Sequence, residues 1–418
     1  MIATGPGDRG RISRCRCCGS EALVETLDLG PQALTGTFPR SLDDKVEVVP
    51  LQLLWCSACT LLQLAHSCDP AMLYGANYGY RSGLNRSMVD HLHRKARGLE
   101  SLVGPQAGDV VLDIGSNDGT LLSAYRSRDL HLIGIDPTAD KFRDFYPAGA
   151  TISPSFFSTG AFSALSDRKA RIITSIAMFY DLEQPRSFVE QIAQCLAADG
   201  IWHFEQSYMP SMLRTTSYDT VCHEHLEYYS LEVVQRMLAE AGLEIADVGF
   251  NRVNGGSFAV TACKPESRIP RHAELVQWLL DQERRIGLDT LAPYQEFARR
   301  VFRHRTDLRD LLTNLRRAGA RLMGLGASTK GNVLLQFCGI GPDLIEAIGD
   351  INPGKFGCVT PGSGIPIVPE AEVHAADPDY LVVLPWHFRD GIIEREKDFL
   401  NRGGRLIFPL PEIEVFGY

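Results

Sequence analysis

A short segment in the middle of the chain, His223-Glu224-His225, brings together side chains that can take up and release protons. An imidazole titrates near neutral pH and so suits a general base, and an adjacent carboxylate can accept a ring N–H and fix the tautomer. The two histidines are two residues apart, so an extended segment would point both to the same side. The spacing is not His-Glu-x-x-His, which excludes a metalloprotease helix. Either these residues do acid–base chemistry or they brace the helix expected over 231–241.

Four cysteines near the N-terminus form two Cys-x-x-Cys pairs, Cys15/Cys18 and Cys56/Cys59. Two such pairs can place four thiolates tetrahedrally around one zinc ion, and four sulfur ligands leave no open coordination position. We therefore predict a structural zinc site and not a catalytic one. The long stretch between the pairs favours a small hairpin domain. Cys17 is a competing ligand, although Cys-x-Cys spacing fits a zinc knuckle less well, and a metal-free cluster is the alternative.

A third group of residues is suited to binding a nucleoside. The apolar run 110–114 contains Asp113, the chain turns at Gly115 and Gly119, and a second apolar run ends at Asp136. Strand, glycine turn, amphipathic helix from position 120, strand and acid make up a nucleoside-binding βαβ unit. Glycine lets the backbone approach a ligand closely, and a carboxylate about 20 residues after the turn suits the hydroxyls of a ribose.

The turn does not match the dinucleotide pattern G-x-G-x-x-G, because positions 117 and 120 are Asn and Thr. Its Asp-x-Gly-x-x-x-Gly arrangement resembles motif I of class I methyltransferases, which bind S-adenosylmethionine. The resemblance puts Asp113 near the methionine end of this cofactor and Asp136 on its ribose. The predicted cofactor contacts are Asp113, Gly115, Ser116, Asn117, Gly119 and Asp136. The alternative is a structural turn in another kind of α/β protein.

The elements that must position these groups require more than one domain. A chain of 418 residues is longer than one typical domain core, so two or three domains are expected.

The net charge of −9 argues against nucleic acid or an anionic membrane as the main partner. No apolar run approaches the ~20 residues of a membrane-spanning helix, and the polar segment 1–14 lacks the apolar core of a signal peptide. We therefore expect a cytoplasmic protein whose cysteines are thiols and metal ligands.

The last third of the chain predicts a second α/β unit. Apolar residues at helical spacing indicate helices over 273–285 and 291–318, followed by a strand–turn–helix from residue 321. The third position of that glycine turn is Thr329, which disfavours a nicotinamide cofactor. Ser328, Thr329 and Lys330 would instead lie at a helix N-terminus, where backbone N–H groups and one positive charge suit a sugar-nucleotide diphosphate.

Polar and aromatic residues follow further predicted strands at 344–348, 380–384 and 405–408. Ligands of open α/β sheets bind beyond the carboxyl ends of the strands, although each such residue alone is as often a loop cap. The residues at these ends are Asp350, Asn352, Lys355, Trp386 and His387. Together they predict a substrate domain that faces the cofactor domain.

Taken in order, these motifs resemble the sugar C-methyltransferase family, and the resemblance covers nearly the whole chain. Besides the cysteine pairs, the glycine turn and His-Glu-His, it rests on Tyr78-x-Tyr80-x-Ser82, on Gly255-Gly256-Ser257 and on the run 324–331. It implies a small zinc-binding domain over 1–80, a class I S-adenosylmethionine methyltransferase domain of Rossmann-like fold over 81–264, and a C-terminal Rossmann-like α/β domain over 265–418.

The family acts on nucleotide-linked 4-keto-deoxy sugars, and the resemblance implies a mechanism. A base removes the acidified hydrogen of C-3, and the enolate attacks the sulfonium methyl group. His225 matches the position of the base, with Glu224 orienting it and His223 in reserve. Tyr78 or Tyr80 would donate a hydrogen bond to the enolate oxygen, and the neighbouring Arg81 would contact substrate.

The chain also departs from the family pattern and leaves several questions open. Many members have tyrosine where this chain has Cys222, and they often have histidine within the segment 177–181. We expect C-3 methylation of a dTDP- or GDP-linked 4-keto-6-deoxy sugar by a monomer or homodimer. The alternatives are a sugar O-methyltransferase, a nicotinamide-dependent reductase or epimerase, and a zinc-organised binding module without turnover.

Overall fold

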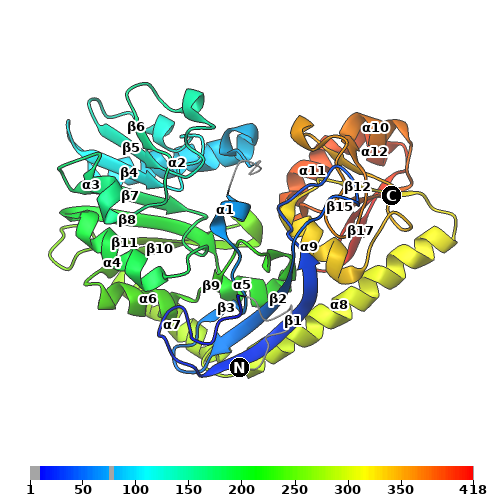
Figure 1. Ribbon diagram of the computed structural model, residues 1–418, viewed down its shortest axis with the longest axis horizontal. Coiled ribbons are helices and arrows are strands. Elements are labelled where there is room, and N and C mark those ends of the chain that lie inside the picture. Colours follow the sequence, from blue (N-terminus) through cyan, green and yellow to red (C-terminus); the bar gives the residue numbers. More distant parts are fainter. Residues whose placement is uncertain (1–9, 75–79, 418) are drawn as a thin grey trace.

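The chain folds into two lobes on a shared base, as the computed structural model shows for residues 10–74 and 80–417 (Figure 1). One lobe is built on a seven-stranded sheet, the other on a six-stranded sheet, and a four-stranded sheet belongs to the base. The predicted α/β fold class, with a cysteine-rich N-terminal region and a C-terminal α/β domain, is confirmed. Tyr78 lies outside the described residues, so its predicted role stays a prediction.

The seven-stranded sheet carries the glycine turn of the sequence motif. In spatial order its strands are β10 (Glu244–Asn251), β11 (Ser257–Cys263), β8 (Leu196–Ser207), β7 (Ala170–Ile176), β4 (Val110–Ile114), β5 (His131–Ile135) and β6 (Thr151–Ser153). Strands β4 to β8 are parallel, and β11 runs antiparallel between β8 and β10. Every residue of β4 is buried, as expected for a parallel strand covered on both faces.

Helices cover both faces of this sheet because successive side chains of a strand point to opposite sides. Val111 of β4 packs with Leu99 of α2 (Arg86–Val103) on one face. Val110 and Leu112 belong to the core on the other face. That face is covered by α4 (Pro185–Cys195), α6 (Leu231–Glu240) and α7 (Ala273–Ile286). Helix α7 therefore packs on this lobe although it follows the last strand of the sheet.

The helix expected directly after the glycine turn is absent, and this prediction was wrong. The segment between β4 and β5 contains only the 3₁₀ turn η2 (Leu122–Ala124). Its apolar residues Leu121 and Ala124 are buried against Leu92 and Ala96 of α2. Helix α2, which precedes β4 in the chain, therefore covers the face that the expected helix would have covered.

The base joins the N-terminal region to both lobes. Its sheet has the order β1 (Leu23–Ala33), β2 (Val48–Cys56), β3 (Leu62–Leu64) and β9 (Glu227–Tyr228). Strand β9 immediately follows the His-Glu-His segment, so the N-terminal sheet holds one end of that segment through β3. Leu27 and Leu51 share a core with Phe297 of the long helix α8 (Ala292–Arg317) and with the C-terminal sheet. Figure 1 shows α8 running beneath this sheet toward the second lobe.

The second lobe is a parallel sheet with one antiparallel edge strand. Its order is β14 (Ile367–Pro369), β13 (Ile348–Asp350), β12 (Leu322–Leu325), β15 (Tyr380–Val383), β16 (Arg405–Phe408) and β17 (Glu414–Phe416). The strand predicted over 344–348 begins only at Ile348, because Leu344 and Ile345 belong to the preceding turn. Helix α9 (Thr329–Cys338) follows β12 as predicted.

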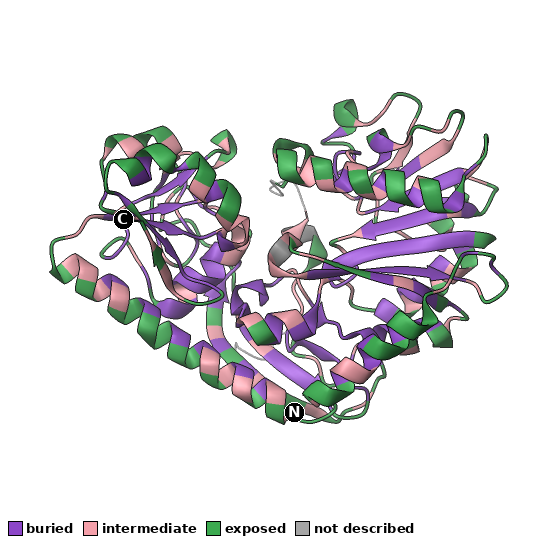
Figure 2. Cartoon of the chain, turned by 180° about the vertical axis from the view of Figure 1, so that it is seen from behind, coloured by how far each residue is buried: buried purple, intermediate pink, exposed green. Residues whose placement is uncertain are grey.

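Burial follows the layered plan of the two lobes. Strands are mostly buried in both lobes, while the surrounding helices are exposed along their outer sides (Figure 2). Across residues 10–74 and 80–417, no helix is both long and apolar enough to cross a membrane.

Candidate active site

A cavity of about 500 Å³ opens at the carboxyl ends of β4, β5, β7 and β8, the side where α/β sheets bind ligands. We call it the inner cavity. Five of the six predicted cofactor residues line it, namely Asp113, Gly115, Ser116, Asn117 and Asp136. The sixth, Gly119, supports the turn from behind, where Tyr146 packs against it.

The glycine turn has the backbone that only glycine adopts readily. Gly115 has a φ of +70°, and a Cβ there would lie 3.0 Å from the Cγ atom of Met178. Gly119 has a φ of +72°, and its Cβ would lie 2.8 Å from the Cδ1 atom of Tyr146. A side chain at either position would be strained and would collide with a packed neighbour. The turn therefore keeps its backbone bare where a ligand can approach.

Two buried carboxylates flank the turn. Asp136 accepts hydrogen bonds from the Asn117 N–H at 2.9 Å and from the Thr138 N–H and hydroxyl at 2.6 Å each. Each carboxylate oxygen has about two acceptor positions, so Asp136 has capacity left for ligand hydroxyls. Asp113 accepts from the Thr174 hydroxyl at 2.6 Å, and burial raises its pKa to about 7. A positively charged ligand group beside Asp113 would restore its ionised form. Both acids thus fit a nucleoside with a cationic end.

His225 lines the same inner cavity as Gly115. Its Nδ1 lies 2.9 Å from the Thr220 carbonyl oxygen, which can only accept, so Nδ1 carries the proton and Nε2 keeps a lone pair. Burial, reinforced by the positive charge of Lys330, lowers the pKa of His225 to about 3. The imidazole is therefore neutral at physiological pH and available as a base.

The structure corrects two expectations about this segment. His223 does not line the inner cavity: it is buried, its Nε2 donates to the Val49 carbonyl at 3.1 Å, and its Nδ1 lies 3.4 Å from the Thr35 N–H. The two histidines face different surroundings because residues 223 and 224 form a turn and not a strand. Glu224 does line the inner cavity, but its hydrogen bonds go to Thr35 and Cys222. The tautomer of His225 is thus fixed by Thr220 and not by Glu224.

Two further polar residues of the inner cavity, Asp181 and Gln206, were missed in the sequence. Gln206 is fully buried, yet neither its amide oxygen nor its nitrogen has a hydrogen-bond partner within the described part of the chain. The same holds for one carboxylate oxygen each of Asp181 and Glu224. A buried polar atom left unpaired costs about 1–3 kcal/mol. The cavity is therefore suited to a ligand rich in hydroxyl and carbonyl groups.

In contrast to Gln206, the neighbouring Glu205 has partners for its carboxylate. Its carboxylate accepts from His91 at 2.6 Å, Lys95 at 2.5 Å and Asn251 at 2.6 Å. These partners lower the pKa of Glu205 despite its burial. Glu205 and Gln206 could have been identified in the sequence as polar residues at the carboxyl end of a strand, a position where ligands bind.

The C-terminal lobe reaches into the inner cavity through α9. Thr329 and Lys330 line it, whereas Ser328 caps the helix by accepting the Gly331 N–H at 3.0 Å. Tyr80 also lines the inner cavity. The predicted diphosphate contacts on α9 thus lie beside His225 instead of in a separate site.

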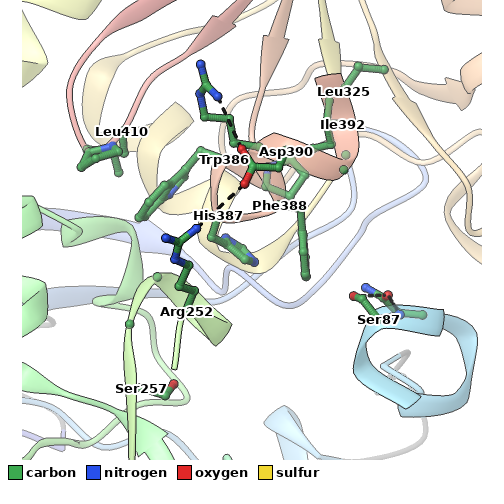
Figure 3. Close-up of a pocket in the computed structure, with 18 of the residues that line it drawn as sticks. Ser87, Arg252, Ser257, Leu325, Trp386, His387, Phe388, Asp390, Ile392 and Leu410 are labelled. Carbon is green, nitrogen blue, oxygen red and sulfur yellow. Dashed lines mark hydrogen bonds and ion pairs between the residues drawn. The ribbon is translucent and has the colours of Figure 1, made fainter. Parts of the chain in front are cut away.

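A larger cavity of about 1220 Å³ lies between the lobes, and we call it the inter-lobe cavity (Figure 3). Three predicted substrate residues line it, namely Asp350, Trp386 and His387. In Figure 3, Arg252 of the first lobe points toward Asp390 of the second. Ser257 lines both cavities, so the two adjoin.

The walls of the inter-lobe cavity carry aromatic side chains and charges of both signs. Three of the arginines that line it, Arg252, Arg389 and Arg395, are paired with acidic residues of the same walls. The other two, Arg86 and Arg214, form no ion pair within the described part of the chain. Trp386 is fixed at the wall because its Nε1 donates to the buried Asp219 at 2.8 Å. The aromatic wall suits a planar base, and Arg86 and Arg214 are the arginines available to an anionic diphosphate.

Besides Ser328, three predicted substrate residues line neither cavity. Arg81 stacks over the ring of Phe145 at 4.0 Å and faces Asp118 at 3.7 Å. The Asn352 side chain accepts the Gly354 N–H at 3.0 Å as a loop cap. Lys355 donates to the Ala327 carbonyl at 2.7 Å. Local partners in each case hold the side chain away from the ligand space.

The four predicted zinc ligands converge. The Sγ atoms of Cys15, Cys18, Cys56 and Cys59 all lie within 4.8 Å of one another. Cys15 and Cys59 are 3.5 Å apart and Cys18 and Cys56 3.6 Å apart. A tetrahedral zinc ion with Zn–S bonds of about 2.3 Å separates its sulfurs by about 3.8 Å. The cluster therefore fits zinc, and Cys17 is not part of it.

Family comparisons agree with this arrangement. The family "C-methyltransferase C-terminal domain" matches residues 252–411, a methyltransferase domain family matches 81–248, and a zinc binding domain family matches 15–74. The chain is 31% identical over 408 residues to the C-methyltransferase NovU of Streptomyces niveus, covering 97% of each protein.

Two solved structures are similar to part of the chain. The N-methyltransferase NodS of Bradyrhizobium japonicum is 14% identical, with 44% of this chain and 99% of that chain covered and a TM-score of 0.32. The amino pentose methyltransferase CalS10 of Micromonospora echinaspora is 15% identical, with 43% and 93% covered and a TM-score of 0.33. The match to NovU along nearly the whole chain decides the matter: the chain belongs to the C-methyltransferase family and is an S-adenosylmethionine-dependent methyltransferase with a zinc-binding N-terminal region.

Proposed function

We propose that this enzyme methylates C-3 of a nucleotide-linked 4-keto-6-deoxy sugar, with dTDP or GDP as the carrier. The observation that carries the proposal is that His225, with a free Nε2, lines the same cavity as the Gly115 turn, and that this cavity adjoins a larger one between the lobes. The inner cavity fits a cofactor beside a compact polar sugar. The inter-lobe cavity has the size and the aromatic surface for a nucleoside diphosphate, and its unpaired Arg86 and Arg214 could contact the phosphates.

The chain's own residues can perform the proton chemistry. S-adenosylmethionine, when bound at the Gly115 turn, supplies an electrophilic methyl group. His225 Nε2 takes the C-3 proton, whose acidity the adjacent ketone raises. The phenol of Tyr80, which also lines the inner cavity, is available as a hydrogen-bond donor to the ligand. The unpaired groups of Asp181 and Gln206 would hold hydroxyls of the sugar ring and thereby orient C-3 toward the methyl group.

The experiment is transfer of a ¹³C-labelled methyl group to a panel of dTDP- and GDP-linked sugars with and without a 4-keto group. Mass spectrometry identifies the methylated product, and NMR identifies the atom that carries the methyl group. We expect a carbon-bound methyl group at C-3 of a 4-keto substrate only. A methoxy signal would establish an O-methyltransferase, and transfer to sugars without the ketone would exclude the enolate mechanism.

A further inference from the structure

Lys330 lies at a helix N-terminus, as its sequence context predicts, and there it reaches the proposed base. It belongs to the first turn of α9, and its side chain lines the inner cavity. Helix α9 packs against η4 (Tyr218–Thr220). The carbonyl of Thr220, at the end of η4, holds the ring of His225. The ammonium group and the proposed base therefore reach the same ligand space from two different lobes.

An acidic residue faces Lys330 in this space. Burial lowers the pKa of Lys330, and the nearby carboxylate of Asp219, on η4, offsets part of that shift. One carboxylate oxygen of Asp219 accepts from Trp386, which fixes the acid in place. The positive charge of Lys330 acts to lower the pKa of His225, Cys222 and His387. Lys330 thus lies beside His225, the proposed catalytic base, in a buried environment where an electrostatic interaction is stronger than in water.

The proposed reaction requires such a charge. When a C–H bond next to a ketone loses its proton, the negative charge develops on the ketone oxygen. A neutral imidazole with a low pKa is a weak base, so it can take this proton only if the developing oxygen anion is strongly stabilised. Preorganised positive groups in a water-excluded site provide this stabilisation. A tyrosine hydroxyl alone is a neutral donor and interacts less strongly with an anion.

We propose that Lys330 is a catalytic residue whose ammonium group pairs with the ketone oxygen of the substrate as that oxygen becomes an enolate. The inference rests on the proposed function. His225 Nε2 takes the proton, the C–H electron pair becomes the C-3=C-4 double bond, and the carbonyl π pair moves to the oxygen beside Lys330. The oxygen then re-forms the carbonyl while C-3 bonds to the methyl carbon. The C–S bond breaks with its electron pair on sulfur, and His225 releases its proton to solvent.

The test separates enolate formation from methyl transfer. Exchange of the C-3 hydrogen with D₂O is followed by NMR, with S-adenosylhomocysteine in place of the methyl donor, for wild type, Lys330→Met and Lys330→Arg. The matched control is Lys397→Met, the same substitution at an exposed lysine of the C-terminal lobe. We expect Lys330→Met to slow exchange and methylation alike by about 100-fold, with KM for the sugar and Kd for S-adenosylhomocysteine within about twofold. Lys330→Arg, which keeps the charge, retains more of both activities, and Lys397→Met is unchanged.

The results distinguish a failure of the proposed role of Lys330 from a failure of the proposed function. Wild-type exchange that persists in Lys330→Met overturns the role of Lys330 and leaves the proposed function standing. The same is true of a large rise in KM at unchanged turnover, which would assign Lys330 to binding of the diphosphate. No exchange in the wild type with any 4-keto sugar overturns the proposed function and this inference with it. If Lys330→Met does not bind S-adenosylhomocysteine normally, Lys330→Gln and Lys330→Arg decide between the same outcomes.

Discussion

Replacing Asp136 with asparagine tests the cofactor site most sharply. The carboxylate already accepts three hydrogen bonds from the turn, two of them from Thr138 and one from Asn117. All three donors are N–H or O–H groups. An asparagine NH₂ would face one set of these donors without accepting from it, and a single amide oxygen would remain for the turn and the ribose. The substitution keeps the shape of the side chain and removes its negative charge.

The expected loss follows from the hydrogen bond to a charged acceptor. Such a bond contributes about 1.5–3 kcal/mol, which corresponds to a roughly 10- to 150-fold higher Kd. Isothermal titration calorimetry with S-adenosylhomocysteine measures this directly. Asp140→Asn is the matched control, because Asp140 is exposed and pairs only with the exposed Arg143 among the described residues. A Kd for Asp136→Asn within twofold of the control, in a protein of unchanged melting temperature, would refute the assignment of the ribose to Asp136.

Three further predictions concern the zinc cluster, the base of the fold and pH. Cys56→Ser should lose the bound zinc and lower the melting temperature, checked by metal analysis and calorimetry; full zinc content would exclude Cys56 as a ligand. Arg16→Met should destabilise the fold by about 3 kcal/mol in urea titration, because Arg16 and Glu227 are both buried and lie 3.9 Å apart. Adding Glu227→Gln should recover part of that loss, and simple additivity of the two changes would contradict the pairing. The pKa of His225 is about 3 in the fold against 6.5 normally. Stability should therefore be full above pH 6.5 and fall toward pH 3, as the unfolded chain takes up the proton first. The acidic loss of stability should shrink in His225→Asn, and an equal loss in both proteins would contradict the low pKa.

Local signals in the sequence were sufficient where a function needs one backbone conformation or one set of ligands. Gly115 was identified because a tight turn after a buried strand requires glycine, and the cysteine pairs because zinc requires four sulfurs at short spacing. Helix α9 followed β12 as expected because Ser328 is a strong helix cap.

Tertiary packing decided the rest. The helix after the glycine turn did not form, because α2 already covers that face of the sheet. His223 and His225 were treated as one unit, but a turn separates their surroundings. No local pattern could show that α9 packs on η4 and brings Lys330 to His225. Gln206 stands in a polar cluster at the end of β8, but its sequence position does not show that it is buried without a hydrogen-bond partner among the described residues.

Hydrogen exchange at C-3 of a dTDP- or GDP-linked 4-keto-6-deoxy sugar, followed in D₂O without any methyl donor, tests the central claim most directly. We predict that the wild-type enzyme exchanges this hydrogen and that His225→Asn does not, while both bind S-adenosylhomocysteine equally well. Undiminished exchange in His225→Asn would show that another group removes the proton and would contradict the role of His225 in the inner cavity.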